Sequence, residues 1–489
     1  MATTEYDHLY IGGEWVKPSG TDTIVVNSPF TEEPIGRVPS PVKADVDRAV
    51  EAARTAFDSG PWPRMKHTER AEIVRKVALA IANETQSWAE LISSEMGAPL
   101  GWGMLGQALA PTMVLNYYAD LATSFKFDEV RQGLLSQVLV TREPVGVVAA
   151  ITPWNVPLLL SCGKLAPALI AGCTIVFKPA PETPLNANRL AETLEEAGLP
   201  KGVLSVIPAD REVAEYLVRH PKVDKVSFTG SGLAGRKIAS ICGEQLKRCS
   251  LELGGKSAAI LLDDVNLDAA LPSLIPNAIM NNGEACIAQT RILAPRDRYD
   301  EVVDALVERV GALKVGDPLD MSTEVGPLVA ERQRDRVEGY IKAGESEGAK
   351  VAVGGGRPSS FSKGWFVEPT VFINVDNSMK IAQEEIFGPV LAVIPYDGDE
   401  SAISIANDSS YGLCGSVWTS DPDRGLKVAR GVRTGTYMLN SSIPFDFATP
   451  FGGFKESGIG REYGPEGLEL FTEIKSINLQ PGYTPNLEG

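Results

Sequence analysis

Hydrophobic and polar positions alternate in a regular way between residues 145 and 254. Short runs rich in β-branched residues predict strands, and stretches with apolar positions at helical spacing predict helices between them. The strands are expected at 146–154, 174–178, 203–208, 225–229 and 249–253, and the helices at 158–171, 184–197, 211–219 and 233–242. Strands that alternate with helices predict right-handed crossovers and a parallel sheet. Such a sheet binds ligands at the carboxyl ends of its strands.

A second alternating block covers residues 257–440. Its clearest strand patterns are at 258–262, 291–294, 390–396 and 416–419. Residues 9–14 and 23–27 predict a two-stranded opening, and helical patterns run from 43 to 125. Residues 126–142 lack a helical stripe and predict a β-hairpin, which is either an internal loop or an arm that reaches a partner. The patterns therefore predict an α/β protein with two parallel-sheet blocks.

Size and charge narrow the class of protein further. At 489 residues the chain exceeds the roughly 250–300 at which one hydrophobic core stops growing, so at least two domains are expected. A formal net charge of −17 without a basic run argues against nucleic-acid binding. The apolar region 144–177 is interrupted by Pro153, Pro157, Pro167 and Lys164, which favours a buried core over a membrane span.

The cysteine and histidine content limits the chemistry. Six cysteines without a C-x-x-C pair indicate a reducing compartment and no zinc site, and the first 15 residues lack an apolar signal core, so we expect a cytoplasmic protein. The only histidines are His8, His67 and His220, each among polar or charged neighbours. A Cys–His dyad or a histidine-rich metal centre is therefore not expected, and the base that serves a cysteine nucleophile would be a carboxylate.

Polar residues and glycines gather at the ends of the predicted strands. These segments are Thr152-Pro153-Trp154-Asn155, Lys178-Pro179, Thr229-Gly230-Ser231 and Glu252-Leu253-Gly254-Gly255. The carboxyl ends of parallel strands meet at one edge of a sheet, so the four segments predict one site.

Cys286 is the candidate nucleophile. A lone cysteine is more often a small buried hydrophobe, and Cys162, Cys173, Cys242 and Cys414 fit that description because their neighbours are aliphatic. Cys286 instead follows a polar turn that contains a glycine, where a thiolate would be accessible. Its place early in the second block predicts that it faces the rim of the first block across a cleft.

Two interpretations compete at the last strand of the first block. The segment from Gly230 to Gly235 matches G-x-G-x-x-G between a strand and a helix, which suits an anion at the helix N-terminus and would make Glu252 a ribose ligand. The match is weak, because 47 glycines allow chance hits and the strand is not the first of its sheet. Glu252 is alternatively a partly desolvated general base, or a strand-end glutamate in a salt bridge.

Asn155 and Lys178 also have two interpretations each. The Asn155 amide would donate to a developing oxyanion, or it would cap the following helix. Lys178 would bind a ribose or phosphate, or it is a solvated lysine.

Taken in order, several of these segments resemble the aldehyde dehydrogenase superfamily. The motifs are Pro153-Trp154-Asn155, Phe177-Lys178-Pro179, Phe228-Thr229-Gly230-Ser231, Leu251-Glu252-Leu253-Gly254-Gly255-Lys256, Gly283-Glu284-Ala285-Cys286, Glu384-Glu385-Ile386-Phe387-Gly388-Pro389 and Pro450-Phe451-Gly452-Gly453-Phe454-Lys455-Glu456-Ser457-Gly458. Seven motifs in the family's order, spread over nearly the whole chain, are a specific resemblance.

The resemblance implies oxidation of an aldehyde to a carboxylate with NAD(P)+, and no metal. Cys286 would form a thiohemiacetal and then a thioester, Asn155 and the Cys286 N–H would hold the oxyanion, and Glu252 would activate water. Of the two roles left open for Glu252, the resemblance therefore favours the general base over the ribose ligand. The implied cofactor residues are Ile151, Thr152, Pro153, Trp154, Lys178, Gly230, Ser231, Gly235, Leu253, Glu385 and Phe387. Glu385 would hold the nicotinamide ribose, and Phe387 would pack near the nicotinamide.

The same resemblance implies a domain division and an assembly. Residues 1–125 and 145–254 would form a Rossmann-like NAD(P)-binding domain, and 255–455 the catalytic domain. Residues 126–144 and 456–489 would form a small β oligomerisation arm and a C-terminal segment whose strand, near 471–480, pairs subunits into a homodimer or homotetramer.

Departures from the family pattern concern the adenosine end and the substrate channel. Members specific for NAD commonly have a glutamate three residues after the lysine, where this chain has Pro181, with Glu182 one residue later. Arg211 would meet a 2′-phosphate, or Asp210 and Glu212 would oppose one; we expect NAD, with NADP as the alternative.

The channel is implied at a set of mostly apolar positions. They are Val156, Leu160, Gly163, Ala285, Ile287, Phe445 and Phe451. Gly163 stands where an aromatic side chain is frequent, which predicts space for a bulky, apolar or aromatic aldehyde. A CoA-acylating semialdehyde dehydrogenase is the first alternative, although that branch generally lacks the base at Glu252. A non-catalytic structural relative is the second, and the presence of Cys286, Glu252 and Asn155 together argues against it.

Overall fold

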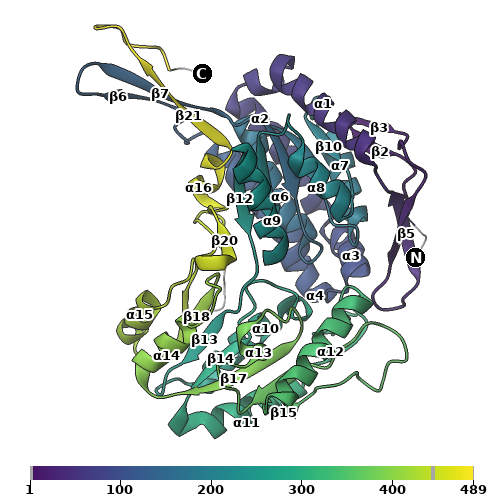
Figure 1. Ribbon diagram of the computed structural model, residues 1–489, viewed down its shortest axis with the longest axis vertical. Coiled ribbons are helices and arrows are strands. Elements are labelled where there is room, and N and C mark those ends of the chain that lie inside the picture. Colours follow the sequence, from purple (N-terminus) through teal and green to yellow (C-terminus); the bar gives the residue numbers. More distant parts are fainter. Residues whose placement is uncertain (1–3, 442–445, 488–489) are drawn as a thin grey trace.

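The computed structural model describes residues 4–441 and 446–487 of the chain. Two large sheets lie in two lobes, one above the other in Figure 1, and a thin β arm projects from the upper lobe. The two predicted alternating blocks correspond to these two sheets.

The upper lobe contains an eight-stranded sheet in the order β20-β12-β11-β8-β9-β10-β2-β3. Its parallel strands are β8 (Val147–Ile151), β9 (Thr174–Lys178), β10 (Leu204–Val206), β11 (Lys225–Thr229) and β12 (Arg248–Glu252); its antiparallel edges are β2 (Leu9–Ile11), β3 (Glu14–Val16) and β20 (Gly458–Ile459). The predicted strands at 174–178 and 225–229 have these bounds. Every residue of β8, β9 and β11 is buried, as expected of parallel strands covered on both faces.

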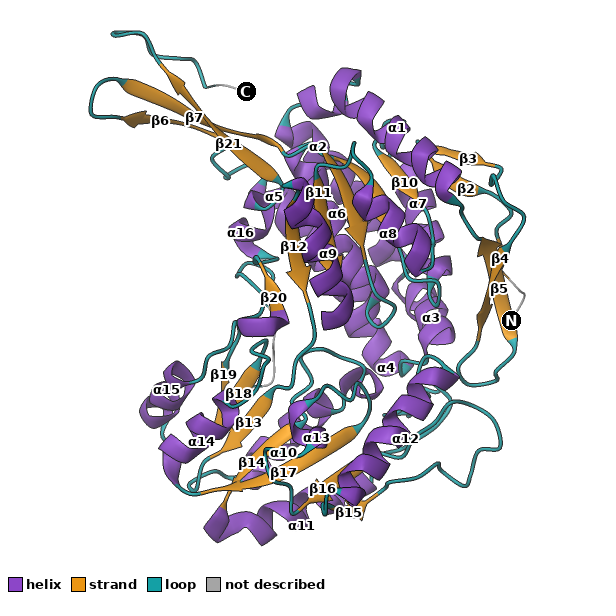
Figure 2. Cartoon of the chain, in the orientation of Figure 1, coloured by secondary structure: helices purple, strands orange, loops and turns teal. Residues whose placement is uncertain are grey.

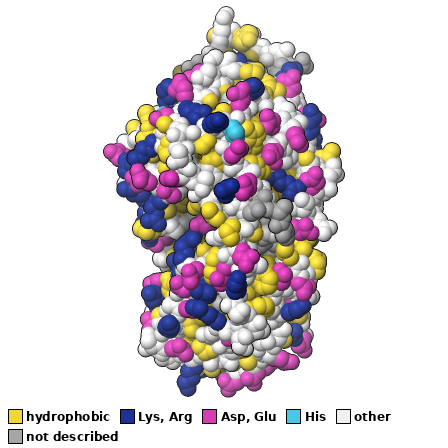
Figure 3. Space-filling view, turned by 90° about the vertical axis from the view of Figure 1, so that its right-hand side faces the viewer, with side chains coloured by type: hydrophobic (Ala, Val, Ile, Leu, Met, Phe, Trp, Pro, Cys, Tyr) yellow, Lys and Arg dark blue, Asp and Glu magenta, His cyan; other side chains and the backbone are white. Residues whose placement is uncertain are grey.

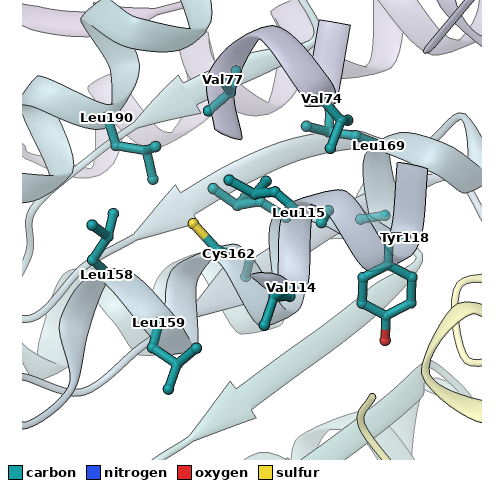
Figure 4. Close-up of a cluster of buried hydrophobic side chains, with 14 of the residues drawn as sticks. Val74, Val77, Val114, Leu115, Tyr118, Leu158, Leu159, Cys162, Leu169 and Leu190 are labelled. Atoms are coloured by element: carbon teal, nitrogen blue, oxygen red, sulfur yellow. The ribbon is translucent and has the colours of Figure 1, made fainter. Parts of the chain in front are cut away.

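Helices lie on both faces of this sheet, and further helices pack on them. The helices of the upper lobe are α1 (Lys43–Ser59), α2 (His67–Asn83), α3 (Thr85–Met96), α4 (Leu100–Trp102), α5 (Ala110–Leu121), α6 (Pro157–Ala171), α7 (Pro184–Glu196), α8 (Arg211–Arg219) and α9 (Gly232–Gln245). Figure 4 shows the apolar side chains that α2, α5, α6 and α7 bury against one another, including Val77, Leu115, Cys162 and Leu190. A π-helical stretch, Gly103–Leu109, precedes α5, and the sequence pattern did not predict it.

The lower lobe contains a seven-stranded sheet in the order β15-β16-β17-β14-β13-β18-β19. Its strands are β13 (Ala258–Leu261), β14 (Arg291–Pro295), β15 (Lys350–Val353), β16 (Thr370–Ile373), β17 (Val390–Tyr396), β18 (Gly415–Trp418) and β19 (Met438–Leu439). Its helices are α10 (Leu267–Ala278), α11 (Tyr299–Gly311), α12 (Glu331–Ser346), α13 (Lys380–Gln383), α14 (Gly398–Asn407) and α15 (Pro422–Gly431). α16 (Gly464–Glu469) belongs to the C-terminal segment that leads back to the upper lobe (Figure 1).

The predicted hairpin forms the arm. β6 (Asp128–Gln132) and β7 (Gln137–Pro144) pair antiparallel, and β21 (Thr472–Asn478) adds to the other edge of β7. The strand expected near 471–480 is β21.

The predicted two-stranded opening is wrong in its pairing. β2 turns at Gly12 and Gly13, whose φ values of 62° and 80° suit a tight hairpin turn, and pairs with β3. The strand at Thr23–Asn27 (β4) pairs instead with β5 (Pro34–Pro39) in a separate sheet with β1 (Thr4–Glu5).

The surface carries both signs of charge. On the face in Figure 3, Lys and Arg side chains lie among Asp and Glu side chains. Within 4–441 and 446–487, no helix is long and apolar enough to cross a membrane.

Candidate active site

The carboxyl ends of β8, β9, β11 and β12 form one rim of the upper sheet. The register pairs Ile151 with Lys178 and Thr229 with Glu252, so the predicted residues at these ends are neighbours. After β12 the chain passes into the lower lobe (Figure 2). There a Cβ on Gly255 would lie 2.3 Å from the Cys286 carbonyl oxygen. Cys286 therefore lies beside the rim, as the sequence predicted.

The loop before Cys286 has an uncommon backbone. Asn281, Asn282 and Gly283 have φ values of 53°, 62° and 75°, in the left-handed region. Asn tolerates this region better than most side chains, and Gly283 is required because a Cβ would meet the Gly388 carbonyl at 2.2 Å. The Asn282 amide fixes the loop by donating to two backbone carbonyls, each at 2.9 Å.

Asn155 is buried in the segment that follows β8, and hydrogen bonds hold both its side-chain amide and its backbone carbonyl. Its Nδ2 donates to the Glu284 carbonyl at 2.8 Å. Its own carbonyl accepts from Gln107 Nε2 and from Asn281 Nδ2, each at 2.9 Å. A side-chain amide has two hydrogens, and among the described residues only the Glu284 carbonyl accepts one of them, so the second is available to a ligand.

Glu252 ends β12 in a dry environment. It is 4% exposed, and within the described part of the chain neither carboxyl oxygen has a hydrogen-bond partner. Its Oε1 lies close to Gly452: a Cβ built on Gly452 would be 2.7 Å from this oxygen. Burial raises the pKa of Glu252 well above its usual range, and the Glu462 carboxylate adds to this, whereas Lys164 and Arg461 oppose it. A buried carboxyl of raised pKa without a fixed partner is suited to accept a proton.

A buried ion pair lies behind Glu252. Lys164, the one charged residue of α6, contacts Glu462, and their side chains are 0% and 6% exposed. Lys164 also donates to Ser227 Oγ at 3.4 Å. Two opposite charges next to a raised-pKa carboxyl can stabilise either of its protonation states, and the sequence did not predict this pair.

The Cys286 thiol is protonated at rest. Burial raises its pKa, and the carboxyls of Glu385 and Glu252 contribute in the same direction. Attack by sulfur needs the thiolate, so a proton acceptor or a positive charge must come close to Cys286 during the reaction.

Glu385, unlike Glu252, has a hydrogen-bond partner that fixes its carboxyl group. Its Oε1 accepts the Gly255 N–H at 2.9 Å, and a Cβ on Gly254 would lie 2.5 Å from Oε2. Burial raises the pKa of Glu385 to about 7, while the Gly255 N–H, Arg336 and Lys256 act against the shift. The carboxylate is thus fixed as an acceptor of further hydrogen bonds.

Phe387 follows on the same loop with a strained backbone. Its φ is 63°, an uncommon value for an aromatic residue, and Gln333 Nε2 donates to its carbonyl at 2.7 Å. The ring meets Trp154 edge to face, with centroids 5.4 Å apart. Backbone strain maintained by such contacts is frequent at ligand sites.

A cavity of about 570 Å³ opens along the rim of the upper sheet. Seven of the predicted cofactor residues line it: Ile151, Thr152, Pro153, Trp154, Lys178, Gly230 and Ser231. Gly235 and Leu253 instead pack on each other, since a Cβ on Gly235 would lie 2.5 Å from Leu253 Cδ2. Glu385 and Phe387 are not among the residues that line this cavity.

One end of the cavity is rich in charge. Lys178 is buried there, and burial lowers its pKa to about 8, against the Glu182 and Asp210 carboxylates. Glu182 also pairs with Arg332 of α12, which belongs to the lower lobe. Arg211 lines the same end.

The predicted space beside Gly163 is filled. A Cβ on Gly163 would lie 3.1 Å from both Cε1 and the hydroxyl oxygen of Tyr463, so an aromatic ring from another segment stands next to the glycine. Ala285, Ile287, Phe451 and Val156 share one hydrophobic cluster with Tyr463, whereas Leu160 does not. Phe445 lies outside the described residues.

Comparison with known proteins agrees with this geometry. The sequence model of the aldehyde dehydrogenase family matches residues 15–477. The chain belongs to this family. Geranial dehydrogenase of Castellaniella defragrans is 48% identical over 98% of this chain and 99% of its own.

The solved structures that resemble this chain include other aldehyde dehydrogenases. Mycobacterium tuberculosis aldehyde dehydrogenase complexed with NAD+ superposes with a TM-score of 0.97 at 53% identity, covering 99% of this chain and 100% of its own. A cysteine-to-alanine mutant of aldehyde dehydrogenase C from Pseudomonas syringae, complexed with NAD+ and octanal, has a TM-score of 0.94 at 40% identity, with 98% of each chain covered.

The residues of this aldehyde dehydrogenase fit a dinucleotide. α9 begins at Gly232, its Ser231 side chain caps the Ala234 N–H at 3.4 Å, and its N-terminus opens on the cavity that Lys178 lines. A helix N-terminus and a lysine suit a phosphate. The Glu385 carboxylate, which accepts the Gly255 N–H, would suit the hydroxyls of a ribose.

Sequence reasoning missed three contributors to the site: Gln107, the Lys164–Glu462 pair and Tyr463. Lys164 had a visible signal, a charge inside an apolar helix, because such a charge needs a buried partner. Gln107 and Tyr463 had none, since their contacts depend on segments far away in the chain.

Proposed function

We propose that this aldehyde dehydrogenase oxidises an apolar or aromatic aldehyde to the carboxylic acid, with NAD+ as the oxidant. The observation that carries the proposal is the surroundings of the Cys286 thiol: the Asn155 amide donates to the Glu284 carbonyl two residues before it, and the carboxyls of Glu252 and Glu385 are close enough to raise its pKa. In the proposed reaction Cys286 is the nucleophile, Asn155 the oxyanion donor, Glu252 the base and Glu385 the ligand of the nicotinamide ribose.

In the first step the Cys286 thiol releases its proton to solvent, and the thiolate sulfur bonds to the aldehyde carbon as the C=O π bond breaks. The carbonyl oxygen gains negative charge, and the second Asn155 amide hydrogen and the Cys286 N–H would hold it. A fixed donor of this kind contributes roughly 2.7–4 kcal/mol in other enzymes. Gln107 and Asn281 hold the Asn155 backbone, so the amide needs no reorganisation when the oxyanion forms.

Loss of the former aldehyde hydrogen as hydride leaves a thioester on Cys286; NAD+, when bound, supplies the acceptor for this hydride and a positive charge that favours the thiolate. The chain's part is to position it: Glu385 would accept from the nicotinamide ribose hydroxyls, and Phe387 with Trp154 would form an apolar wall beside the ring. Lys178 and the N-terminus of α9 would meet the adenosine and phosphate side.

Glu252 completes the reaction. It takes a proton from water as the water oxygen bonds to the thioester carbon, the C–S bond breaks, and the thiol is regenerated with release of the acid. The Lys164–Glu462 pair stands behind Glu252: Lys164 would favour the charged form of Glu252, and Glu462 would favour the neutral form.

NAD+ is favoured over NADP+ by the charge at the adenosine end. The Glu182 and Asp210 carboxylates both act on Lys178, so a 2′-phosphate there would meet two negative charges beside one positive charge. Arg332, which pairs with Glu182, and Arg211, which lines the cavity, act against this preference.

A CoA-acylating activity is the competing function. That reaction transfers the acyl group to a thiol and needs no water-activating base, so the dry Glu252 carboxyl of raised pKa favours hydrolysis. The test is a panel of aldehydes assayed with NAD+ and NADP+ side by side, with and without coenzyme A. We expect free acid and NADH without coenzyme A; a strict requirement for coenzyme A would contradict the proposal.

We also propose the domain division and assembly implied by the family. Residues 1–125 and 145–254 would bind NAD+, 255–455 would carry the nucleophile, and 126–144 with 456–489 would form the arm and C-terminal segment. The arm supports a homodimer or homotetramer, because β6 and β21 are its open edges and Leu134 and Leu135 at its tip are fully exposed. Light scattering during gel filtration checks this, and a stable monomer would contradict it.

A further inference from the structure

Gly163 and Tyr463 form a complementary pair across the site. Gly163 precedes Lys164 on α6, and Tyr463 follows Glu462 on the C-terminal segment, so the pair is adjacent to the buried ion pair. The Tyr463 ring and hydroxyl occupy the place of a side chain at position 163, with Cε1 and the hydroxyl oxygen 3.1 Å from where a Cβ would be. The Tyr463 ring can take this position only because residue 163 has no side chain.

Tyr463 is one of three aromatic rings that meet beside the nucleophile. Its centroid lies 5.2 Å from that of Phe447, edge to face, and 6.1 Å from that of Phe451 at 52°. The three rings belong to the same hydrophobic cluster as Ala285 and Ile287, which flank Cys286 in sequence, and Cys286 packs against this cluster. The carboxyl of Glu252 is near enough to raise the pKa of the phenol after burial and Glu462, so the hydroxyl stays neutral.

The backbone of Tyr463 is strained to place this ring. Its φ of 58° and ψ of 175° lie in a region that only glycine adopts readily. Neighbouring hydrogen bonds enforce the conformation: Glu462 and Phe451 exchange two backbone hydrogen bonds at 2.7 Å, and the Tyr463 carbonyl accepts from the Gly467 N–H at 2.8 Å. Strained residues of this kind cluster at active sites and ligand sites, where the surrounding structure holds them in place.

We propose that Tyr463, seated over Gly163, selects the aldehyde: with Phe447 and Phe451 it forms an aromatic wall that prefers a flat chain, conjugated next to the carbonyl, over a saturated chain of equal length. This inference rests on the proposed oxidation of aldehydes at Cys286. Conjugated carbons lie in one plane and present a π surface, which ring edges and faces contact closely. Tetrahedral CH₂ groups are thicker and lack that surface.

A matched pair of substrates tests the proposal. Cinnamaldehyde and 3-phenylpropanal differ only in the double bond next to the carbonyl, and kcat/KM with NAD+ is measured for both. Because conjugation changes the intrinsic reactivity of the aldehyde, the ratio is compared between variants. Tyr463→Leu is expected to lower the cinnamaldehyde to 3-phenylpropanal ratio by about fivefold to tenfold, as expected for loss of an aromatic contact.

Two further variants keep the test independent of folding. Tyr463→Phe retains the ring and should retain the ratio within twofold, and Gly163→Ala pushes a Cβ against an intact ring and should lower the ratio in the same direction as Tyr463→Leu. Tyr483→Leu, at an exposed tyrosine of the C-terminal tail, is the matched control and should keep the wild-type ratio. Thermal unfolding of each variant accompanies the kinetics.

The outcomes separate this inference from the function on which it rests. If wild-type enzyme oxidises neither aldehyde with NAD+, the proposed function fails. If it oxidises both and the ratio is the same within twofold in wild type, Tyr463→Leu and Gly163→Ala, the function stands and the role of Tyr463 is overturned.

Discussion

Two glutamates flank Cys286, and the regions around them are built in opposite ways. Glu385 is fixed by the Gly255 N–H at 2.9 Å and crowded by Gly254, and its pKa is about 7. Glu252 has no hydrogen-bond partner within the described residues, and its carboxyl faces the small Gly452. The same side chain is thus used once as a fixed ligand and once as a free proton acceptor.

The comparison shows how environment sets the role of a carboxyl group. Burial raises the pKa of both glutamates, but at Glu385 the Gly255 N–H acts against the shift and fixes one orientation, as binding of ribose hydroxyls requires. Burial at Glu252 favours the neutral form, and neither carboxyl oxygen has a partner among the described residues, so either can accept a proton from water. The following variants would break or sharpen this contrast.

Glu252→Gln should have the largest effect. The amide keeps the shape of the side chain but cannot accept a proton, so steady-state kcat should fall by about 10²–10⁴-fold with little change in KM for NAD+. The measurement is steady-state NADH formation at saturating aldehyde. A kcat within threefold of wild type would exclude Glu252 as the base.

Lys164→Met should destabilise the protein and move its pH profile. Removing one partner of a buried ion pair leaves Glu462 uncompensated and costs about 3–5 kcal/mol of unfolding free energy. Lys164 lowers the pKa of Glu252, so without it the Glu252 pKa rises and the acidic limb of the pH–kcat profile shifts to higher pH.

Denaturant unfolding and a pH–kcat series check both effects. The double variant Lys164→Met with Glu462→Leu is the control, because replacing the whole pair with apolar residues should restore most of the stability. An unchanged pH profile in the single variant would separate the ion pair from Glu252.

Binding of NAD+ should depend on pH through Glu385. Hydrogen bonds from ribose need the ionised carboxylate, and the pKa of Glu385 is about 7, so KM for NAD+ should be flat above pH 7 and rise about tenfold per unit below it. Glu385→Gln should weaken NAD+ binding at pH 8 by about 10–100-fold and remove this dependence. Titration of NAD+ binding by fluorescence measures it, and a variant with the wild-type pH dependence would point to another group.

Asp210→Asn should have the smallest effect. The amide still caps α8 at Val213, so the fold is kept, while one negative charge near Lys178 is lost. The ratio of kcat/KM for NADP+ to that for NAD+ should rise about fivefold, as for about 1 kcal/mol of charge interaction. Asp421→Asn, at the N-cap of the remote α15, is the control, and an equal rise in that variant would mean that the effect is not local.

The sequence was a good guide to the elements that carry chemistry. The strands at 174–178, 225–229 and 390–396 have the predicted bounds, because buried parallel strands are short, apolar and bounded by glycine and proline. Strand ends on one rim follow from parallel topology alone, so the sequence pattern was enough to predict that Ile151, Lys178, Thr229 and Glu252 are neighbours.

The remaining features depended on one local turn and on distant contacts. The turn at Gly12 and Gly13 pairs β2 with β3, and β4 pairs with β5; the Gly-Gly pair was the signal for this hairpin. The partner of Lys164 lies in the C-terminal segment, and the space predicted beside Gly163 is filled from that same segment by Tyr463. The side chain that Gly163 lacks on α6 is replaced in space by the Tyr463 ring, and the sequence around Gly163 gives no sign of this.

The most direct test of the central claim is a pre-steady-state burst experiment with Glu252→Gln. The variant is mixed with excess aldehyde and NAD+, and NADH is followed by stopped-flow absorbance while intact-protein mass spectrometry follows Cys286. We expect a burst of one NADH per active site, followed by a stall with the acyl group retained as a thioester on Cys286. Continued turnover at the wild-type rate, or no burst and no acylated protein, would contradict the assignment of Glu252 as the base that releases the acid.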